Sequence, residues 1–241
     1  MESSGCMKKA SKYIKKVLIT GTSSGIGKAV ALLFLSKNKD EDAFEVIGID
    51  KNDSTIQNPF YTHYQVDLRN KESLPDIEDI SILINNAGSQ NSEDDIENNL
   101  KSTIYVTEKY AFQNSIKSVL FNASASAHTG FEFPYYSASK AGILGYMKNV
   151  AWRLAKQYKA TCNSISCGGV FTSLNDDVVY DEKCWKEIMK ATPLKKWATA
   201  EEIAEWIYFL TVINKSCTGQ DILIDNGEKD LNCTFVWPGI K

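Results

Sequence analysis

The sequence has little of what would mark a metalloprotein, a disulfide-stapled protein, a membrane protein or a nucleic-acid binder. It holds two histidines and six cysteines with no CxxC spacing, so we expect no metal site and reduced thiols. No apolar run approaches the roughly 18 residues of a membrane span, and the start MESSGCMKKA lacks an apolar signal core. The net charge is -3 with dispersed Lys and Arg, which disfavours nucleic acid as a partner. We therefore expect a soluble, cytoplasmic protein that does not bind membranes.

Proline is also scarce, at five residues, and no Pro/Gly/Ser-rich linker, repeat or charge run divides the chain. We predict a single domain over residues 15–227. Residues 1–14 are interpreted as a leader or flexible N-terminus, with Met7 as a plausible alternative start. The tail 228–241 contains apolar residues that are more stable buried, either on the parent subunit or across an oligomer interface: Phe235, Val236 and Trp237.

Short β-rich runs alternate with longer stretches of helical character. The runs are apolar without interruption, as expected of strands buried on both faces of a parallel sheet. Seven strands with helices between them predict an α/β fold of the Rossmann type, doubly wound, with a mostly parallel sheet and helices on both faces. The polar, acidic stretch 89–99 is interpreted as a solvated helix start. The seven predicted strands are 16–20, 45–50, 63–68, 81–86, 118–123, 162–166 and 221–225.

A glycine-rich turn, TGTSSGIG at residues 20–27, separates the first predicted strand from an apolar helix. Glycines at this place allow a tight turn and a close approach of the backbone to a pyrophosphate, which the start of the helix then faces. A glycine turn without a ligand is the competing explanation for an isolated motif of this kind. The position between a strand and a helix favours a nucleotide site.

The second predicted strand ends at Asp50. A carboxylate there accepts hydrogen bonds from the adenosine ribose hydroxyls and repels a 2′-phosphate, which favours NAD over NADP. Lys51 and Lys28 are close enough in the chain to reach such a phosphate, although ordinary surface lysines are the simpler interpretation. Asp67, at the end of the third predicted strand, is either a contact on the adenine side or a turn residue.

The stretch YYSASK at residues 135–140 offers a second chemical motif, YxxxK. Helical spacing places Lys140 beside Tyr136, whereas Tyr135 has a serine at that spacing. A second match, Tyr105 with Lys109, precedes the fifth predicted strand, so position in the fold favours the Tyr136 pair. A nearby ammonium favours the ionised form of a phenol, whose unperturbed pKa of about 10 is otherwise too high for proton exchange near neutral pH.

Five motifs occur in order: TGTSSGIG (20–27), INNAG (84–88), NL (99–100), YSASK (136–140) and CGGVFT (167–172). Together they resemble the classical short-chain dehydrogenase/reductase family over nearly the whole chain. The resemblance implies a Rossmann-type domain and a nicotinamide cofactor, with NAD favoured and NADP possible. It also implies hydride transfer to or from a secondary alcohol or carbonyl substrate, and a homotetramer or homodimer built with the segments 193–210 and 218–227.

The resemblance assigns a catalytic set of Tyr136, Lys140, Ser124 and Asn99. Ser124 follows the fifth strand one residue closer to Tyr136 than is usual, and Ser126 takes its place if that strand bulges. Asn99 matches the asparagine that holds a water for proton relay, at a shorter spacing from INNAG than is usual. His128 is interpreted as a polar or pocket-wall residue rather than a general base.

The same resemblance predicts the cofactor contacts. Cys167 stands where the family usually has proline, so the loop below the nicotinamide is expected to be more mobile. The predicted cofactor-binding residues are Gly21, Ser23, Ser24, Gly25, Ile26, Gly27, Asp50, Asp67, Leu68, Asn85, Ala87, Gly88, Tyr136, Lys140, Gly168, Val170 and Thr172.

Residues 173–192 occupy the family's substrate-loop region. Their apolar members form either a lid over the substrate or an ordinary packed helix face: Val178, Val179, Tyr180, Trp185 and Met189. Two other functions share these features. One is a nucleotide-binding regulatory protein that keeps the fold without turnover, and the other is a nucleotide-sugar epimerase or dehydratase, disfavoured because we expect such enzymes to carry a larger C-terminal domain.

Overall fold

A computed structural model describes residues 14–39, 43–131 and 133–231. The central sheet has the strand order β3-β2-β1-β4-β5-β6-β9, and every neighbouring pair in it is parallel. The predicted doubly wound α/β fold is therefore confirmed. The strands are β1 (Ile14–Thr20), β2 (Ala43–Asp50), β3 (Tyr61–Gln65), β4 (Ile80–Asn85), β5 (Ser118–Asn122), β6 (Thr161–Cys167) and β9 (Asp221–Ile224).

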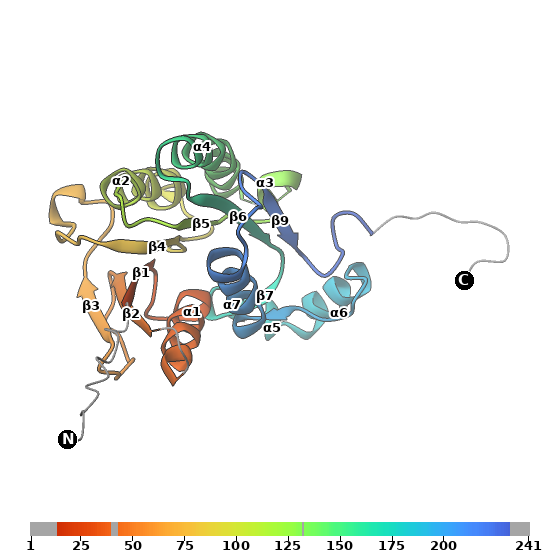
Figure 1. Ribbon diagram of the computed structural model, residues 1–241. Coiled ribbons are helices and arrows are strands. Elements are labelled where there is room, and N and C mark those ends of the chain that lie inside the picture. The colour runs from red at the N-terminus through yellow and green to blue at the C-terminus, as the bar shows by residue number, and fades with distance from the viewer. Residues whose placement is uncertain (1–13, 40–42, 132, 232–241) are drawn as a thin grey trace, which may run out of the picture.

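Helices cover both faces of this sheet (Figure 1). The longer ones are α1 (Gly25–Ser36), α2 (Ser102–Tyr110), α4 (Pro134–Tyr158) and α7 (Ala200–Tyr208). In Figure 1, α2 and α4 lie on one face, and α1 and α7 lie on the other. Two buried apolar clusters fill the resulting layers. Central strands such as β4 are buried along their whole length, which explains why their sequences do not alternate between apolar and polar residues.

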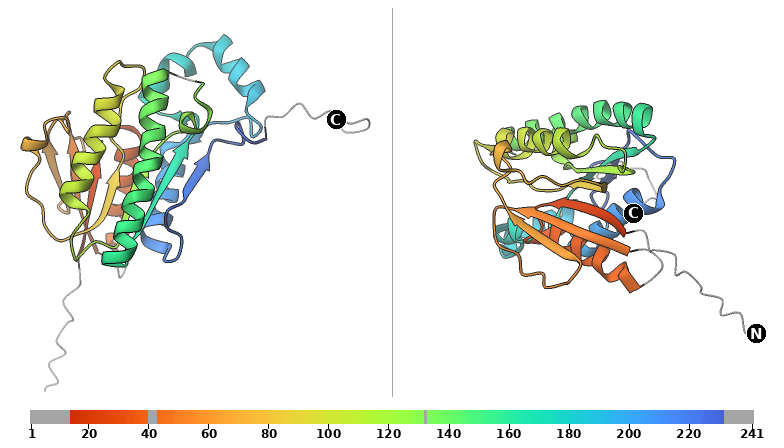
Figure 2. Two further views of the ribbon diagram at one scale, coloured as in Figure 1. Left: turned by 90° about the horizontal axis from the view of Figure 1, so that it is seen from above. Right: turned by 60° about the vertical axis from the view of Figure 1, so that its left-hand side comes forward.

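Three further helices lie in the segments that follow β5 and β6. They are the short helices α3 (Ser126–Thr129) and α5 (Asp176–Val179), and the longer α6 (Glu182–Ala191). A two-residue strand β7 (Val170–Phe171) pairs with β8 (Ala198–Thr199) in a second small sheet that the sequence did not predict. In the left view of Figure 2, the α5–α6 segment lies at the same end of the sheet as the start of α4.

Two sequence predictions need correction. The third strand ends at Gln65, so Asp67 lies in the loop beyond it. The stretch 89–99 does lead into a helix, and Asn91, Glu93 and Asp94 are exposed. Asp95, however, is fully buried, and its carboxylate accepts hydrogen bonds from Ser89 Oγ at 2.6 Å and Ser92 N at 3.1 Å. A π-helical turn, Ile96–Lys101, then leads into α2.

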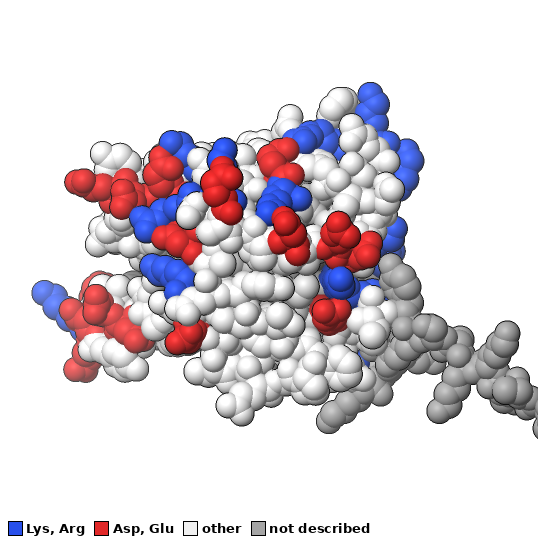
Figure 3. Space-filling view, turned by 90° about the vertical axis from the view of Figure 1, so that its left-hand side faces the viewer, with Lys and Arg blue, Asp and Glu red and all other residues white. Residues whose placement is uncertain are grey.

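The expectations about membrane spans, metal sites and surface charge can be compared with the described residues only. None of the described helices is long and apolar enough to cross a membrane, and no cluster of potential metal ligands occurs among the described residues. On the face in Figure 3, basic and acidic side chains are interspersed. The predictions for residues 1–13 and for Phe235, Val236 and Trp237 lie outside the described residues.

Candidate active site

A cleft of about 450 Å³ opens at the carboxyl-terminal end of the sheet. It lies where the chain, after winding outward from β1 to β3, returns to place β4 on the other side of β1. Such a reversal is where open α/β sheets bind ligands. Of the predicted site residues, the cleft is lined by Gly21, Ser24, Gly25, Ile26, Asp50, Asp67, Leu68, Ala87, Gly88, Tyr136, Lys140, Gly168, Val170 and Thr172.

The glycine-rich turn forms one wall of the cleft. Gly21 has a φ of +78°, and a Cβ on Gly27 would lie 2.0 Å from the Gly21 carbonyl oxygen, so both positions require glycine. Ser24 precedes α1 without making a side-chain cap. The first N–H groups of the helix are therefore left for an anionic group in the cleft.

Thr20 and Asn86 fasten this turn to the end of β4. Thr20 Oγ1 accepts hydrogen bonds from the backbone N–H groups of Asn86 and Ala87, both at 3.0 Å. The Asn86 side chain donates to the Thr20 carbonyl at 3.1 Å and accepts from Asn122 at 2.9 Å. These contacts join the ends of β1, β4 and β5 into one edge.

The structure does not bring Asn85 into the cleft, in contrast to the prediction from INNAG. Its side chain is buried and donates to Thr107 Oγ1 at 3.1 Å, on the side of α2. The neighbouring Asn86 lines the cleft instead, because successive residues of a strand face opposite sides of the sheet. The alternation along β4 was the signal that could have separated the two asparagines.

Asp50 lies at the outer end of the cleft. One carboxylate oxygen accepts from Ser23 N at 3.0 Å and the other from Asn52 N at 2.9 Å, which fixes the side chain while leaving lone pairs for a ligand. Ser23 does not line the cleft, so its contribution is to hold Asp50. Lys51 also lines the cleft, whereas Lys28 Nζ donates to Thr55 Oγ1 at 2.7 Å.

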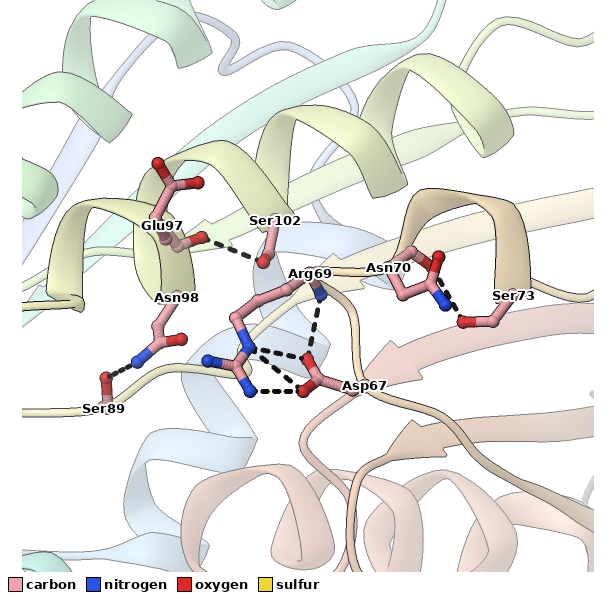
Figure 4. A network of polar contacts seen from close by, with 8 residues as sticks. All are labelled: Asp67, Arg69, Asn70, Ser73, Ser89, Glu97, Asn98 and Ser102. Carbon is pink, nitrogen blue, oxygen red and sulfur yellow. Dashed lines mark hydrogen bonds and ion pairs between the residues drawn. The ribbon is translucent and has the colours of Figure 1, made fainter.

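Asp67 is paired with Arg69, a cleft residue that the sequence analysis missed (Figure 4). The guanidinium donates to the carboxylate at 2.6 to 3.1 Å, and the side-chain hydrogen bond from Arg69 holds the pKa of Asp67 below its ordinary value. Three further polar residues that line this part of the cleft are Ser89, Asn98 and Ser102.

Tyr136 and Lys140 meet at the inner end of the cleft. Tyr136 lies in the first turn of α4, and Lys140 Nζ is 5.6 Å from the centre of its ring. Lys140 is 5% exposed and donates to the Asn122 carbonyl at 3.0 Å. Burial lowers the pKa of its ammonium from 10.5 to about 8, so the group remains mostly positive at neutral pH.

The competing YxxxK pair lies elsewhere. Lys109 Nζ donates to the Leu74 carbonyl at 2.6 Å and forms an ion pair with Asp76 at 2.9 Å. Neither Tyr105 nor Lys109 lines the cleft. The structure therefore places only the Tyr136 pair among the cleft residues.

Asn99 lies behind Lys140 and is fully buried. Its amide accepts from Ser89 N at 2.7 Å and donates to Ser139 Oγ at 3.0 Å, which ties the π-helical turn to α4. A Cβ on Gly88 would lie 3.0 Å from Asn99 Oδ1 and 3.5 Å from Lys140 Nζ. The absence of a side chain at Gly88 thus leaves space for both the asparagine amide and the lysine ammonium beside it.

Ser124 and Ser126 are both buried and contact each other, with their hydroxyl oxygens 3.1 Å apart. The Ser124 hydroxyl is also 3.5 Å from the Cys167 carbonyl, and neither serine lines the cleft. His128 Nε2 lies 2.7 Å from Asp221 Oδ2 and 3.3 Å from Ser166 Oγ. This histidine therefore joins α3 to β6 and β9.

Comparisons with known proteins identify the family of the chain. The family model described as "Enoyl-(Acyl carrier protein) reductase" matches residues 69–229. The chain belongs to the short-chain dehydrogenase/reductase family. Its relatives in this family are named dehydrogenases and reductases, and the chain is an oxidoreductase that acts on alcohol or carbonyl groups.

Three members of the family illustrate the likeness. The chain is 28% identical to the 3-oxoacyl-[acyl-carrier-protein] reductase of Buchnera aphidicola subsp. Schizaphis graminum, covering 88% of this chain and 96% of that one. It is 26% identical to the L-rhamnose 1-dehydrogenase (NADP(+)) of Thermoplasma acidophilum, covering 88% and 95%. The structure of 4-hydroxyisoleucine dehydrogenase complexed with NADH has a TM-score of 0.80 and 28% identity, covering 89% and 98%.

The predicted substrate-loop region, residues 173–192, is fixed at its base by aromatic packing. Trp185 of α6 contacts Trp197 and Phe171, with ring centroids 5.1 and 5.5 Å apart. Trp197 in turn covers Gly169, where a Cβ would lie 2.0 Å from the indole. Trp185 is thus a packing residue, whereas Tyr180 is 82% exposed.

Cys167, which stands in the usual proline position of the family, is buried at the end of β6 and lines the cleft. Its thiol lies 3.7 Å from Asn122 Oδ1, and burial raises its pKa to about 12. The thiol is therefore protonated at neutral pH.

Proposed function

We propose that this enzyme transfers a hydride between NAD(H) and a secondary alcohol or carbonyl compound, with Tyr136 as the general acid and base. The observation that carries the proposal is one continuous cleft with Asp50 at one end and the Tyr136–Lys140 pair at the other. The glycine-rich turn lies along the same cleft, as a dinucleotide with its pyrophosphate at the start of α1 requires.

The residues present fit a nicotinamide dinucleotide. The uncapped start of α1 would hold the pyrophosphate, and Asp50 would accept hydrogen bonds from the adenosine ribose. Lys140 would hold the nicotinamide ribose, since one of its three N–H groups is donated to Asn122 and the others remain. When bound, the cofactor supplies the hydride, and the protein supplies orientation and electrostatics.

The proton steps then belong to this chain's own residues. The Tyr136 hydroxyl would exchange a proton with the substrate oxygen, helped by the positive charge of Lys140 beside its ring. Ser124 would donate a hydrogen bond to that same oxygen after its contact with Ser126 opens. Asn99 would support proton relay through Lys140, because its buried amide fixes the backbone behind the lysine.

Preference for NAD over NADP is part of the proposal. The Asp50 carboxylate lies at the ribose end of the cleft, and two backbone N–H groups fix its position. A 2′-phosphate at this place would meet a negative charge that cannot turn away. Lys51 and Arg69 are cations that line the cleft. Because Arg69 is paired with Asp67, Lys51 is the one that most directly opposes this preference.

The test begins with fluorescence titrations of the protein with NADH and NADPH, repeated with Asp50→Ala. Tight NADH binding that the substitution relaxes toward NADPH supports the assignment. Turnover is then measured on a panel of alcohols and carbonyls, with Tyr136→Phe expected to lose activity and Tyr105→Phe as the matched control. Binding without turnover of any compound in the panel would instead support the non-catalytic alternative.

We also propose that the enzyme is a homodimer or homotetramer. The strand β9 lies at one edge of the sheet. The surface of α7 and of the π-helical turn that follows it, Phe209–Ile213, exposes Trp206, Phe209 and Ile213 at 43%, 48% and 55%. Apolar side chains gathered in this way are typical of an interface. Sedimentation velocity tests the proposal, and a monomer at micromolar concentration would contradict it.

A further inference from the structure

A chain of hydrogen bonds runs behind the wall of the cleft, from the glycine-rich turn to the loop that follows β2. Tyr61 Oη lies 2.9 Å from Thr22 Oγ1 and 3.1 Å from His63 Nδ1. On its other side, His63 Nε2 lies 2.9 Å from the Asn52 carbonyl oxygen. Two side chains of the edge strand β3 therefore connect two loops that are far apart in the sequence.

The chemistry of the hydrogen-bonding groups determines which of them donates at the His63–Asn52 contact. A backbone carbonyl only accepts hydrogen bonds, so His63 Nε2 must carry a hydrogen and donate it to Asn52. The Tyr61 hydroxyl has a single hydrogen, which it donates either to Thr22 Oγ1 or, when the imidazole is neutral, to His63 Nδ1; in the second case the Thr22 hydroxyl donates to Tyr61. Thr22 is fully buried, so its hydroxyl depends on a protein partner such as Tyr61.

Strand β2, which lies between the glycine-rich turn and β3, leaves space for this chain of hydrogen bonds. Gly48 of β2 lies opposite His63 in the β2–β3 register. A Cβ at this position would be 2.3 Å from both Thr22 Oγ1 and the Tyr61 hydroxyl oxygen. The close contact across β2 is therefore possible only because residue 48 has no side chain.

At Asn52, this chain of hydrogen bonds reaches the residues that hold Asp50. The Asn52 carbonyl, which accepts from His63, also accepts from Ser23 Oγ at 2.9 Å. The backbone N–H groups of Asn52 and Ser23 donate to the two oxygens of the Asp50 carboxylate. The glycine-rich turn and the loop after β2 are thus joined at two points, directly through Ser23 and indirectly through β3.

We propose that Tyr61 and His63 are positioning residues for the adenosine half of the cofactor, an inference that rests on the proposed function. Neither side chain lines the cleft, so they act through the loops that do. They hold the glycine-rich turn and the Asp50 carboxylate at a fixed separation before the ligand arrives. Without this link, binding must also order the loop, which lowers the affinity.

The experiment measures the Kd of NADH and NADPH by fluorescence, and that of ADP by displacement, because ADP carries the adenosine and diphosphate but no nicotinamide. Tyr61→Phe removes one hydroxyl, and His63→Leu removes the donor to Asn52. Each is expected to raise the Kd of the preferred dinucleotide and of ADP by the same factor, about 3- to 10-fold, as the loss of one hydrogen bond predicts.

Two further variants separate positioning from general weakening. His63→Gln keeps an N–H donor and is expected to recover most of the affinity lost in His63→Leu. Tyr64→Phe is the matched control on the same strand, because Tyr64 packs against the cluster on the opposite face of the sheet. Its Kd values are expected to remain within twofold of the wild type.

Several results would overturn the inference. One is a Kd unchanged in Tyr61→Phe and His63→Leu while the wild type binds a dinucleotide, even if the Tm falls, which would leave the proposed function intact. Another is an equal loss in Tyr64→Phe, which would indicate a general effect of the edge strand. A wild type that binds neither dinucleotide would refute the proposed function, and this inference with it.

Discussion

Replacement of Lys140 by methionine is expected to stabilise the fold at neutral pH while abolishing turnover. The ammonium is buried beside Tyr136, and among the described residues it forms no ion pair with a carboxylate. Its fixed partner is the neutral carbonyl of Asn122. A buried charge with so little compensation lowers the stability of the folded protein. The enzyme retains this charge because the function of the group requires it.

The magnitude follows from the pKa of Lys140, which burial lowers from 10.5 to about 8. At about 1.4 kcal/mol for each pH unit between these two pKa values, the buried charge destabilises the folded state by about 3 kcal/mol at pH 7. The folded protein binds this proton more weakly than the unfolded chain, so the penalty is complete below pH 8 and disappears as the pH rises to 10.5. The Asn122 carbonyl loses a donor in the variant, which costs about 1 to 2 kcal/mol.

The expected net gain for Lys140→Met is therefore about 1 to 2 kcal/mol at pH 7, or roughly 2 to 8 °C in Tm for a chain of this size. Urea unfolding without cofactor, at pH 7 and pH 9.5, measures it. The advantage over the wild type should shrink by about 2 kcal/mol between the two pH values. Lys109→Met is the control, since that lysine is paired with Asp76. A variant less stable at pH 7, or an advantage independent of pH, would refute the reasoning.

Two other predictions test the packing of the cleft. Gly27→Ala places a Cβ 2.0 Å from the Gly21 carbonyl oxygen. It should therefore lower the free energy of unfolding in urea by about 1 to 3 kcal/mol and weaken NADH binding. Gly145→Ala is the control: there is open space around the new methyl group, so this variant should be neutral or stabilising. Iodoacetamide at pH 8 should label the exposed Cys184 but not Cys167, whose buried thiol has a raised pKa; peptide mapping measures this, and native labelling of Cys167 would contradict the described burial.

Local sequence patterns were sufficient for the architecture. Inner strands such as β4 are buried along their whole length and appear as apolar runs, whereas the edge strands β3 and β9 contain no buried residue; all seven predicted runs nevertheless correspond to strands. The order of the motifs also distinguished Tyr136 from Tyr105, because only one pair follows β5 and starts a helix at the carboxyl end of the sheet. Spacing along one helix is a local property, and it brought Lys140 beside Tyr136.

Interpretations that required knowledge of a distant partner were less successful. The acidic stretch 89–99 suggests a solvated helix start, yet Asp95 is buried because its hydrogen-bond donors lie in the loop that folds over it. Arg69 gives no motif, and its place in the cleft depends on where the chain turns after β3. Asn85 and Asn86 are chemically identical, so only the pleat of β4 decides which one faces the cleft.

By itself, the sequence determined the fold class, the glycine-rich turn and the Tyr136–Lys140 pair, because periodicity and short motifs depend only on residues that are close together in the chain. Only the tertiary structure decided that Tyr61 and His63 connect the two loops at the cofactor end. That connection crosses Gly48 of an intervening strand. It exists only once β2 and β3 have paired in register, and no local pattern encodes a contact between residues brought together by that pairing.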